Sequence, residues 1–346
     1  MNHQQAMQRA LDLAKKGKGH VAPNPLVGCM IVHDGKIVAE GYHEKFGEAH
    51  AEVNAINVLP DSINPALATL YVTLEPCSHF GKTPPCADLI IKTGFKKVVV
   101  AVQDPNPKVS GRGIQKLREA GIEVIVGVLE AEAKALNKAF FTFHQKQRPH
   151  LILKWAQTAD GFISRLPVPK NKSENKISGA EAHELVHALR SEVMGIMVGK
   201  NTVLSDNPHL TTRLVEGKNP IRIVIDKNLE IPSTYNVFSK EAKTIVFNGI
   251  KDELHENISL IKLDFEKEIL SQMLAKLYQL QIQSILVEGG STLLQSFIDA
   301  RLWDESYVFE NPDLKFGHGL KAPVFEKGTD FKMLGKDRLF YLKRSY

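Results

Sequence analysis

The residues of this 346-residue chain with the clearest chemical potential lie between positions 50 and 86. His50 stands two residues before Glu52, and Cys77 and Cys86 each follow a proline. One imidazole and two thiolates suit Zn²⁺, and three protein ligands leave the fourth tetrahedral position open, as a catalytic zinc requires. Glu52 is then placed to carry a proton from a water on the metal to a leaving group. The pattern therefore predicts a zinc-dependent hydrolytic site.

A His-x-Glu with two Pro-Cys pairs is typical of zinc-dependent nucleoside and nucleobase deaminases. The commoner spacing is Cys-x-x-Cys, whereas residues 78–85 separate the two cysteines here. His79 lies between them and is an alternative ligand, although we prefer a substrate-facing or solvent-exposed role for it. Cys29 stands in an apolar run, residues 28–32, and is expected to be a core residue.

A second candidate site follows the strand expected at residues 284–287. Glu288 precedes two glycines, and a helix is expected to begin within the next few residues. A glycine pair lets backbone amides approach a ligand at a helix N-terminus, which favours phosphate. Tight packing of strand on helix is an equally simple reason for the glycines. The dinucleotide fingerprint Gly-x-Gly-x-x-Gly is not present at this position.

Short strands and helices must position the first site. The spacing of apolar residues predicts strands at 26–33, 36–40, 69–74, 97–102 and 122–128, and helices at 7–16, 49–59, 87–93, 113–120 and 130–142. Strands separated by helices of this length indicate a three-layer α/β sheet. The polar, proline-terminated segment 144–149 suits a linker, so we expect one domain at 1–146 and a second at 149–346.

The second domain is also expected to be α/β. Strands are predicted at 151–155, 193–198, 221–225, 244–247 and 284–287, with a closing strand over 337–346, and helices at 180–191, 266–280 and 292–300. Between its first strand and first helix lies a proline- and lysine-rich loop, residues 166–176, with little apolar content.

Composition excludes several classes of protein. Lys and Arg number 44 against 39 Asp and Glu, which predicts a mixed surface and does not indicate nucleic-acid binding. No apolar run approaches the roughly 20 residues of a membrane span. The first residues show no signal-peptide pattern, so we expect a cytoplasmic protein. Three cysteines do not make a disulfide framework.

Motifs in both halves resemble the bifunctional deaminase/reductase family of riboflavin biosynthesis. The matching segments are 24–28, 47–52, 74–79, 81–86 and 104–107 in the first half and 153–161, 198–213 and 287–290 in the second. The resemblance covers essentially the whole chain. It implies an N-terminal three-layer α/β/α cytidine-deaminase-like domain and a C-terminal dihydrofolate-reductase-like α/β domain.

The resemblance also implies a reaction sequence. The first domain would deaminate 2,5-diamino-6-ribosylamino-4(3H)-pyrimidinone 5′-phosphate, using one Zn²⁺ per chain. The second would reduce the ribosyl side chain with NADPH to give 5-amino-6-ribitylaminouracil 5′-phosphate. The expected partner is thus a small phosphorylated pyrimidine, with no nucleic acid and no membrane, and the family leans towards a homo-oligomer.

Family roles extend to individual residues. Those expected to contact the ribotide in the deaminase are Asn24, Lys82, Asp104 and Asn106, with Lys82 the candidate for its 5′-phosphate. Those expected at the ribotide phosphate in the reductase are Arg190, Leu210 and Arg213, while Glu288 would meet both substrate and cofactor. The expected cofactor contacts are Lys154, Gln157, Thr202, Asp206, Gly289, Gly290, Ser291, Thr292, Leu293 and Leu294. Without the resemblance these residues are equally typical of turns, a helix cap and solvated charges.

One departure from the family concerns the loop before the first helix of the second domain. Family members carry an aromatic residue where this chain has Lys176, so Lys170, Lys172 or Lys176 would supply charge there instead. Three alternatives are kept: a nucleic-acid deaminase with an unrelated appendage, a zinc-stabilised binding protein without catalysis, and a chain that has lost the reductase alone.

Overall fold

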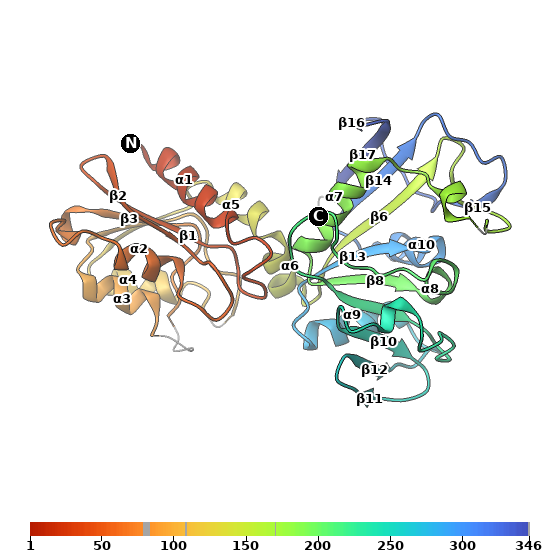
Figure 1. Ribbon diagram of the computed structural model, residues 1–346. Helices are drawn as coiled ribbons and strands as arrows, with labels where there is room; N and C mark the ends of the chain where they lie inside the picture. The colour runs from red at the N-terminus through yellow and green to blue at the C-terminus, as the bar shows by residue number, and fades with distance from the viewer. Residues whose placement is uncertain (79–83, 108, 170, 345–346) are drawn as a thin grey trace. The chain divides into compact units, whose positions relative to one another are not determined.

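The computed structural model describes residues 1–78, 84–107, 109–169 and 171–344. The chain divides into two compact units, Met1–Gln147 and Arg148–Tyr346. Each unit has its own sheet, coloured red to yellow in the first unit and yellow-green to blue in the second (Figure 1). The functional residues of each unit are therefore positioned by that unit's own elements.

A five-stranded sheet in the order β2-β1-β3-β4-β5 forms the centre of the first unit. β1 is antiparallel to β2 and β3, whereas β3, β4 and β5 are parallel. The strands predicted at 26–33 and 36–40 form a hairpin, in which His33 pairs with Lys36 across a turn whose residues Asp34 and Gly35 have φ of 49° and 72°. The strands are β1 (Gly28–His33), β2 (Lys36–Tyr42), β3 (Thr69–Val72), β4 (Lys97–Val100) and β5 (Glu123–Val126).

Helices cover both faces of this sheet. Successive side chains of β1 point to opposite faces and are apolar on both, so each face needs a covering layer. Cys29 and Ile31 pack with α2 and α3, so Cys29 is the core residue that was expected. Met30 and Val32 point to the opposite face and pack with α1 and α6. The helices are α1 (His3–Lys15), α2 (Ala51–Asn57), α3 (Cys86–Thr93), α4 (Arg112–Glu119), α5 (Glu130–Leu136) and α6 (Lys138–Lys146).

One expectation for the end of this unit is wrong, and another is only partly correct. The single helix predicted at 130–142 is two helices, because Asn137 turns its side chain to Leu26, accepting from its N–H at 2.8 Å and donating to its carbonyl at 2.8 Å. The segment predicted as a linker, 144–149, contains the boundary between the two units, but it is helical as far as Lys146. Arg148 is buried in the second unit, where its guanidinium donates to Asp304 at 2.6 and 2.8 Å.

A ten-stranded sheet in the order β11-β12-β10-β9-β8-β13-β6-β14-β17-β16 runs through the second unit. The strands from β12 to β14 in this order are parallel, and antiparallel strands close both edges. The strands are β6 (His150–Thr158), β8 (Gly195–Gly199), β9 (Ile221–Ile225), β10 (Thr244–Asn248), β11 (Glu253–Leu254), β12 (Ile258–Lys262), β13 (Ser284–Gly289), β14 (Glu305–Asn311), β16 (Lys332–Leu334) and β17 (Asp337–Lys343).

This sheet also has helices on both faces. Leucines and phenylalanines of α9 (Ile269–Gln279) and α10 (Ser291–Asp299) pack on one face. α7 (Ala180–Glu192) and α8 (Lys200–Asp206) pack on the other. A separate pair of strands, β7 (Phe162–Arg165) and β15 (Gly319–Lys321), flanks the predicted lysine-rich loop. Among the described helices of either unit, none is long and apolar enough to cross a membrane.

Candidate functional sites

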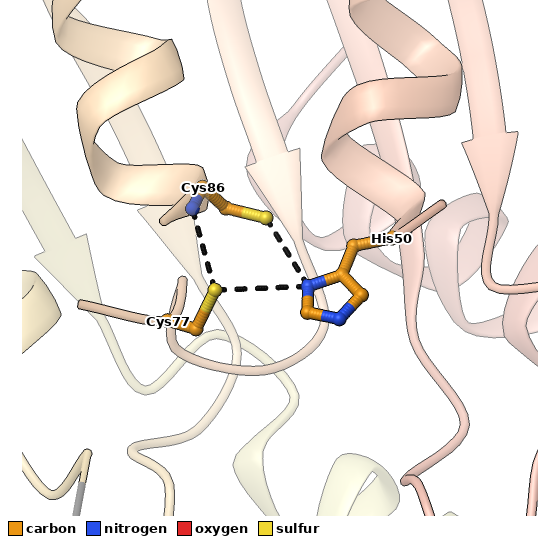
Figure 2. A group of neighbouring side chains, drawn as sticks. All are labelled: His50, Cys77 and Cys86. Atoms are coloured by element: carbon orange, nitrogen blue, oxygen red, sulfur yellow. Dashed lines mark hydrogen bonds between the residues drawn. The ribbon is translucent and has the colours of Figure 1, made fainter. Parts of the chain in front are cut away.

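Three potential metal ligands converge in the first unit. His50 is the N-cap of α2, Cys86 is the first residue of α3, and Cys77 lies in the loop after β3. His50 Nδ1 is 3.3 Å from Cys86 Sγ and 3.6 Å from Cys77 Sγ, and the backbone N–H of Cys86 donates to Cys77 Sγ at 3.3 Å (Figure 2). The three ligand atoms all lie within 4.8 Å of one another, so a single ion can contact all three.

Glu52 is buried one turn from these ligands, in the first turn of α2, with 3% of its surface exposed. Burial, together with the negative charge of Cys77, raises the pKa of Glu52 to about 7. The hydrogen bond from the Cys86 thiol is the largest cause that lowers the pKa of Cys77, to about 4. The site thus combines a thiolate at Cys77 with a carboxyl at Glu52 that can take up and release a proton near neutral pH.

Asn24 is held beside this group by a histidine that the sequence did not reveal. Its side-chain amide donates to His43 Nε2 at 3.1 Å, while His43 Nδ1 donates to the carbonyl of Ala49 at 2.9 Å. The ring of His43 meets that of His50 edge-on, with centroids 5.6 Å apart. No motif marks His43, because the β1–β2 pairing and not the local sequence brings it to the site.

A second overlooked residue is Glu75, two positions before Cys77. Its buried carboxylate accepts the backbone N–H groups of Asp104 (3.1 Å), Gly111 (2.8 Å), Gly113 (2.9 Å) and Ile114 (3.3 Å). Glu75 therefore ties the loop of Asp104 and the start of α4 to the loop that carries Cys77.

Asp104 itself is buried, and burial raises its pKa to about 7. Its Oδ1 accepts the backbone N–H of Asn106 at 2.7 Å. Two other residues considered for this site, Lys82 and the alternative ligand His79, lie outside the described residues.

The second unit contains a cleft of about 1310 Å³ at the carboxyl ends of its parallel strands. Ligands bind at this edge in open α/β sheets. The lining includes most of the residues expected to meet cofactor or substrate, namely Lys154, Thr202, Asp206, Glu288, Gly289, Gly290, Ser291, Thr292, Leu293 and Leu294. Residues of the lysine-rich loop line it too, including Lys176. That loop therefore faces the cleft even though it lacks the family aromatic.

An ion pair lies at the inner end of the cleft. Arg190 donates to both oxygens of Glu288, at 2.8 and 2.7 Å. Burial would raise the pKa of Glu288, but the charge and hydrogen bonds of Arg190 outweigh burial and bring that pKa to about 2. Burial lowers the pKa of Lys154, and the charge of Glu288 opposes this effect. The inner cleft therefore offers a buried amine beside a permanently ionised carboxylate.

Four expected residues are not among the lining residues of this cleft. Arg190 reaches it only through Glu288. Gln157 accepts from the indole N–H of Trp155 at 2.9 Å, and Leu210 is buried in an apolar cluster with a φ of 54°. Arg213 donates its backbone N–H to His187 Nδ1 at 2.9 Å and its guanidinium to Thr211 Oγ1 at 2.9 Å.

The cleft has room and donors for a dinucleotide between α8 and α10. Gly290 is the N-cap of α10, whose first-turn amides have no partner within the helix. A Cβ at Gly290 would lie 3.3 Å from Thr202 Oγ1, so the glycine keeps the backbone open where α10 and α8 approach each other. Backbone donors at a helix start, with a hydroxyl opposite, suit a pyrophosphate.

Each half of the chain matches a known family of proteins. Residues 1–102 match the family model of the cytidine and deoxycytidylate deaminase zinc-binding region, and residues 149–333 match that of the RibD C-terminal domain. The riboflavin biosynthesis protein RibD of Aquifex aeolicus is 47% identical, over 98% of this chain and 97% of its own. RibD of Escherichia coli is 38% identical, over 91% and 89%.

Solved structures resemble the whole chain. The crystal structure of a Thermotoga maritima diaminohydroxyphosphoribosylaminopyrimidine deaminase/5-amino-6-(5-phosphoribosylamino)uracil reductase gives a TM-score of 0.87 at 38% identity, covering 99% of this chain and 98% of that one. A structure of Acinetobacter baumannii RibD gives 0.86 at 32% identity, covering 98% of each chain. These matches confirm the two fold classes expected from the sequence.

Proposed function

Since the chain belongs to the RibD family of riboflavin biosynthesis enzymes, with a deaminase and a reductase on one chain, we propose which of its residues perform each step. His50, Cys77 and Cys86 hold the zinc ion of the deaminase, and the cleft of the second unit holds NADPH and the ribotide. The observation that carries this proposal is the convergence of three soft ligands around a buried Glu52.

In the deaminase, zinc supplies a Lewis acid that makes a water easier to deprotonate. Glu52 is placed to accept a proton from the attacking water as its oxygen bonds to the ring carbon, and to return that proton to the amino group, whose bond to the same carbon breaks so that it leaves as ammonia. Asn24, fixed by His43, presents its amide to the pyrimidine ring. Asp104 and Asn106 hold the ribotide from the neighbouring loop, together with Lys82.

In the reductase, NADPH supplies a hydride for the ribosyl side chain. Residues 289–294, which run from the end of β13 through the N-cap into the first turn of α10, bind the cofactor together with Thr202 and Asp206 of α8. Lys154 and Glu288 lie at the inner end, where they orient the ribosyl group and where the Lys154 amine can donate a proton. Arg190 and Arg213 sit behind Glu288 and Thr211 and attract the substrate phosphate.

The cytoplasm is the compartment we propose, and a small phosphorylated pyrimidine is the partner, in keeping with relatives that act on such compounds. A homo-oligomer is the proposed assembly. Sedimentation of the purified protein tests the assembly, and a single monomeric species at micromolar concentration would contradict it.

The proposal is tested by giving the purified chain the diaminopyrimidine ribotide and NADPH, and following ammonia release and NADPH oxidation together. Ammonia should appear first and oxidation should follow. Glu52→Gln should lower the rate of ammonia release by about 10³-fold, because a positioned acid–base group contributes on that order, while zinc content stays unchanged. Glu52→Gln should still oxidise NADPH when given the deaminated ribotide, and loss of that activity as well would contradict the assignment of separate sites.

A further inference from the structure

A charged pair stands at the rim of the reductase cleft and takes no part in the steps above. Lys200 is the first residue of α8 and lines the cleft. Its ammonium donates to Glu230 Oε2, and the other oxygen of Glu230 accepts from the Asn228 side chain at 2.8 Å. The Lys200 and Glu230 side chains are 27% and 46% exposed, so both can move without disturbing a core.

The fold places this pair at the carboxyl edge of the sheet. β8 and β9 are parallel neighbours in which Gly199 pairs with Ile225. Lys200 follows β8 directly, and Glu230 lies in the loop that follows β9. Val203 on α8 packs with Ile231 of that loop, so the lysine and the carboxylate meet across a fixed contact between the two segments.

The direction of a bound dinucleotide follows from the charges of the cleft. Lys154 and Glu288 line the cleft, and the Glu288 side chain is only 9% exposed, so we place the hydride transfer to the ribosyl group beside these two residues. The first turn of α10 takes the pyrophosphate at mid-cleft, because backbone donors at a helix N-terminus favour it. The adenosine half is then directed outward along α8. Among the described lining residues contributed by α8 and α10, Lys200 is the cation.

We propose that Lys200 binds the 2′-phosphate of NADPH and thereby selects NADPH over NADH. The inference rests on the proposed function of this cleft and adds a specificity residue to it. A phosphate carries more negative charge than the carboxylate of Glu230, so the flexible Lys200 ammonium leaves Glu230 and binds the phosphate. Glu230 opposes the exchange, since its carboxylate competes for Lys200 and repels the incoming phosphate. A carboxylate at this position instead tolerates the bare 2′-hydroxyl of NADH.

The test measures dissociation constants of the full-length, zinc-loaded protein for NADPH and NADH, from the fluorescence of the bound nicotinamide. Lys200→Met should weaken NADPH binding by about tenfold, the size of one charge-assisted contact, and leave NADH binding within about twofold. Glu230→Gln should strengthen NADPH binding several-fold and leave NADH unchanged. Competition by 2′-phospho-AMP, but not by AMP, should weaken in Lys200→Met.

Lys227→Met is the matched control. Lys227 is a lysine of the same loop as Glu230, paired with Glu266 at 3.3 Å, and it is not among the lining residues of the cleft. An NADPH-selective loss in Lys227→Met, or an equal loss for NADPH and NADH in Lys200→Met, would overturn the assignment of Lys200. Failure of the wild-type protein to bind either nucleotide would instead overturn the proposed function of the cleft.

Discussion

At the scale of single residues, a carboxylate near the zinc ligands, that of Glu75, has a structural role. Both carboxylate oxygens of Glu75 accept hydrogen bonds from backbone N–H groups, all of which belong to the segment 104–114. Its role is to hold the loops around the zinc ligands. A carboxylate of this kind carries no motif of its own, so its function becomes visible only when the backbone donors converge on it.

Glu75→Gln should lower the free energy of unfolding of the first unit by about 3 kcal/mol, because the amide lacks the charge and one of the two acceptor oxygens that serve four backbone N–H groups, three of them in buried hydrogen bonds. Urea unfolding followed by circular dichroism measures the change. Glu119→Gln serves as the control, since Glu119 is exposed and accepts a hydrogen bond from the Gln115 side chain at 2.8 Å, and the change should cost less than about 0.5 kcal/mol. Equal stabilities of the two variants would contradict the role of Glu75.

His187 makes the reductase unit sensitive to mild acid. Burial is the main cause that lowers its pKa, to about 4, and the charges of Arg190 and Arg213 act in the same direction. Its neutral Nδ1 accepts the backbone N–H of Arg213. The unfolded chain therefore binds this proton at higher pH than the folded chain, so the contribution to stability is full above about 6.5 and is lost as the pH falls towards about 4.

His187→Asn keeps an acceptor for Arg213 and removes the titration. The variant should lose less of its free energy of unfolding than the wild type when the pH is lowered from 7 to 4.5, as measured by urea unfolding at both values. A variant that loses as much stability as the wild type over this interval would show that other groups cause the acid sensitivity.

At the scale of elements, α4 fixes the position of a zinc ligand through a close approach. A Cβ at Gly113 would lie 2.0 Å from the carbonyl oxygen of Pro76, the residue before Cys77. Gly113→Ala must push α4 away from this loop or shift the loop itself. We expect zinc affinity to fall by about 10- to 100-fold, the range for changes just outside a ligand shell.

Competition with a chromophoric chelator measures that affinity. Gln115→Ala is the control on the exposed side of the same helix and should bind zinc like the wild type. Unchanged zinc affinity in Gly113→Ala would show that the Pro76 loop does not depend on α4.

Most elements could be predicted from periodicity, and the exceptions have physical reasons. β14 was missed because its Glu305, Ser306, Glu310 and Asn311 interrupt the apolar pattern, although the strand is buried between β6 and β17. The split between α5 and α6 was missed because it depends on the bonds of Asn137 to Leu26, far away in the sequence.

Some residues of the candidate sites could likewise be predicted from the sequence, and others could not. His50, Cys77 and Cys86 could be singled out because a zinc site needs imidazole and thiolate ligands, which few side chains supply. No motif marks His43, and Glu75 entered only as part of the matching segment 74–79 with no role of its own, because the roles of both residues come from contacts that the fold creates. Arg190 was expected at the ribotide phosphate, which stays a prediction, and its pairing with both oxygens of Glu288 could not be read from the sequence because residues 98 positions apart form it.

At the scale of the whole molecule, the two units have separate sheets and cores, and Arg148 marks the start of the second. Its guanidinium bonds Asp304, whose carboxylate also accepts the backbone N–H of Leu151 at 2.8 Å. Arg148→Met removes the guanidinium from that buried carboxylate. The second unit should lose about 3–5 kcal/mol of its free energy of unfolding, the usual cost of breaking a buried pair.

NADPH binding during a urea titration measures this loss, and ammonia release should survive to the same urea concentration as in the wild type. Lys227→Met breaks an exposed pair in the same unit and should cost less than about 1 kcal/mol. A parallel loss of ammonia release in Arg148→Met would show that the units do not unfold separately.

The strand order has a consequence for synthesis on the ribosome. β6 is the first strand of the second unit, yet its neighbours in the sheet are β13 and β14, which end at Gly289 and Asn311. All five strands of the first sheet lie before residue 127, so the deaminase can fold and take up its metal early in translation. Both edges of β6 stay unpaired until more than a hundred further residues have emerged from the ribosome. Because unpaired strand edges promote aggregation, the chain most needs protection while the reductase is being synthesised.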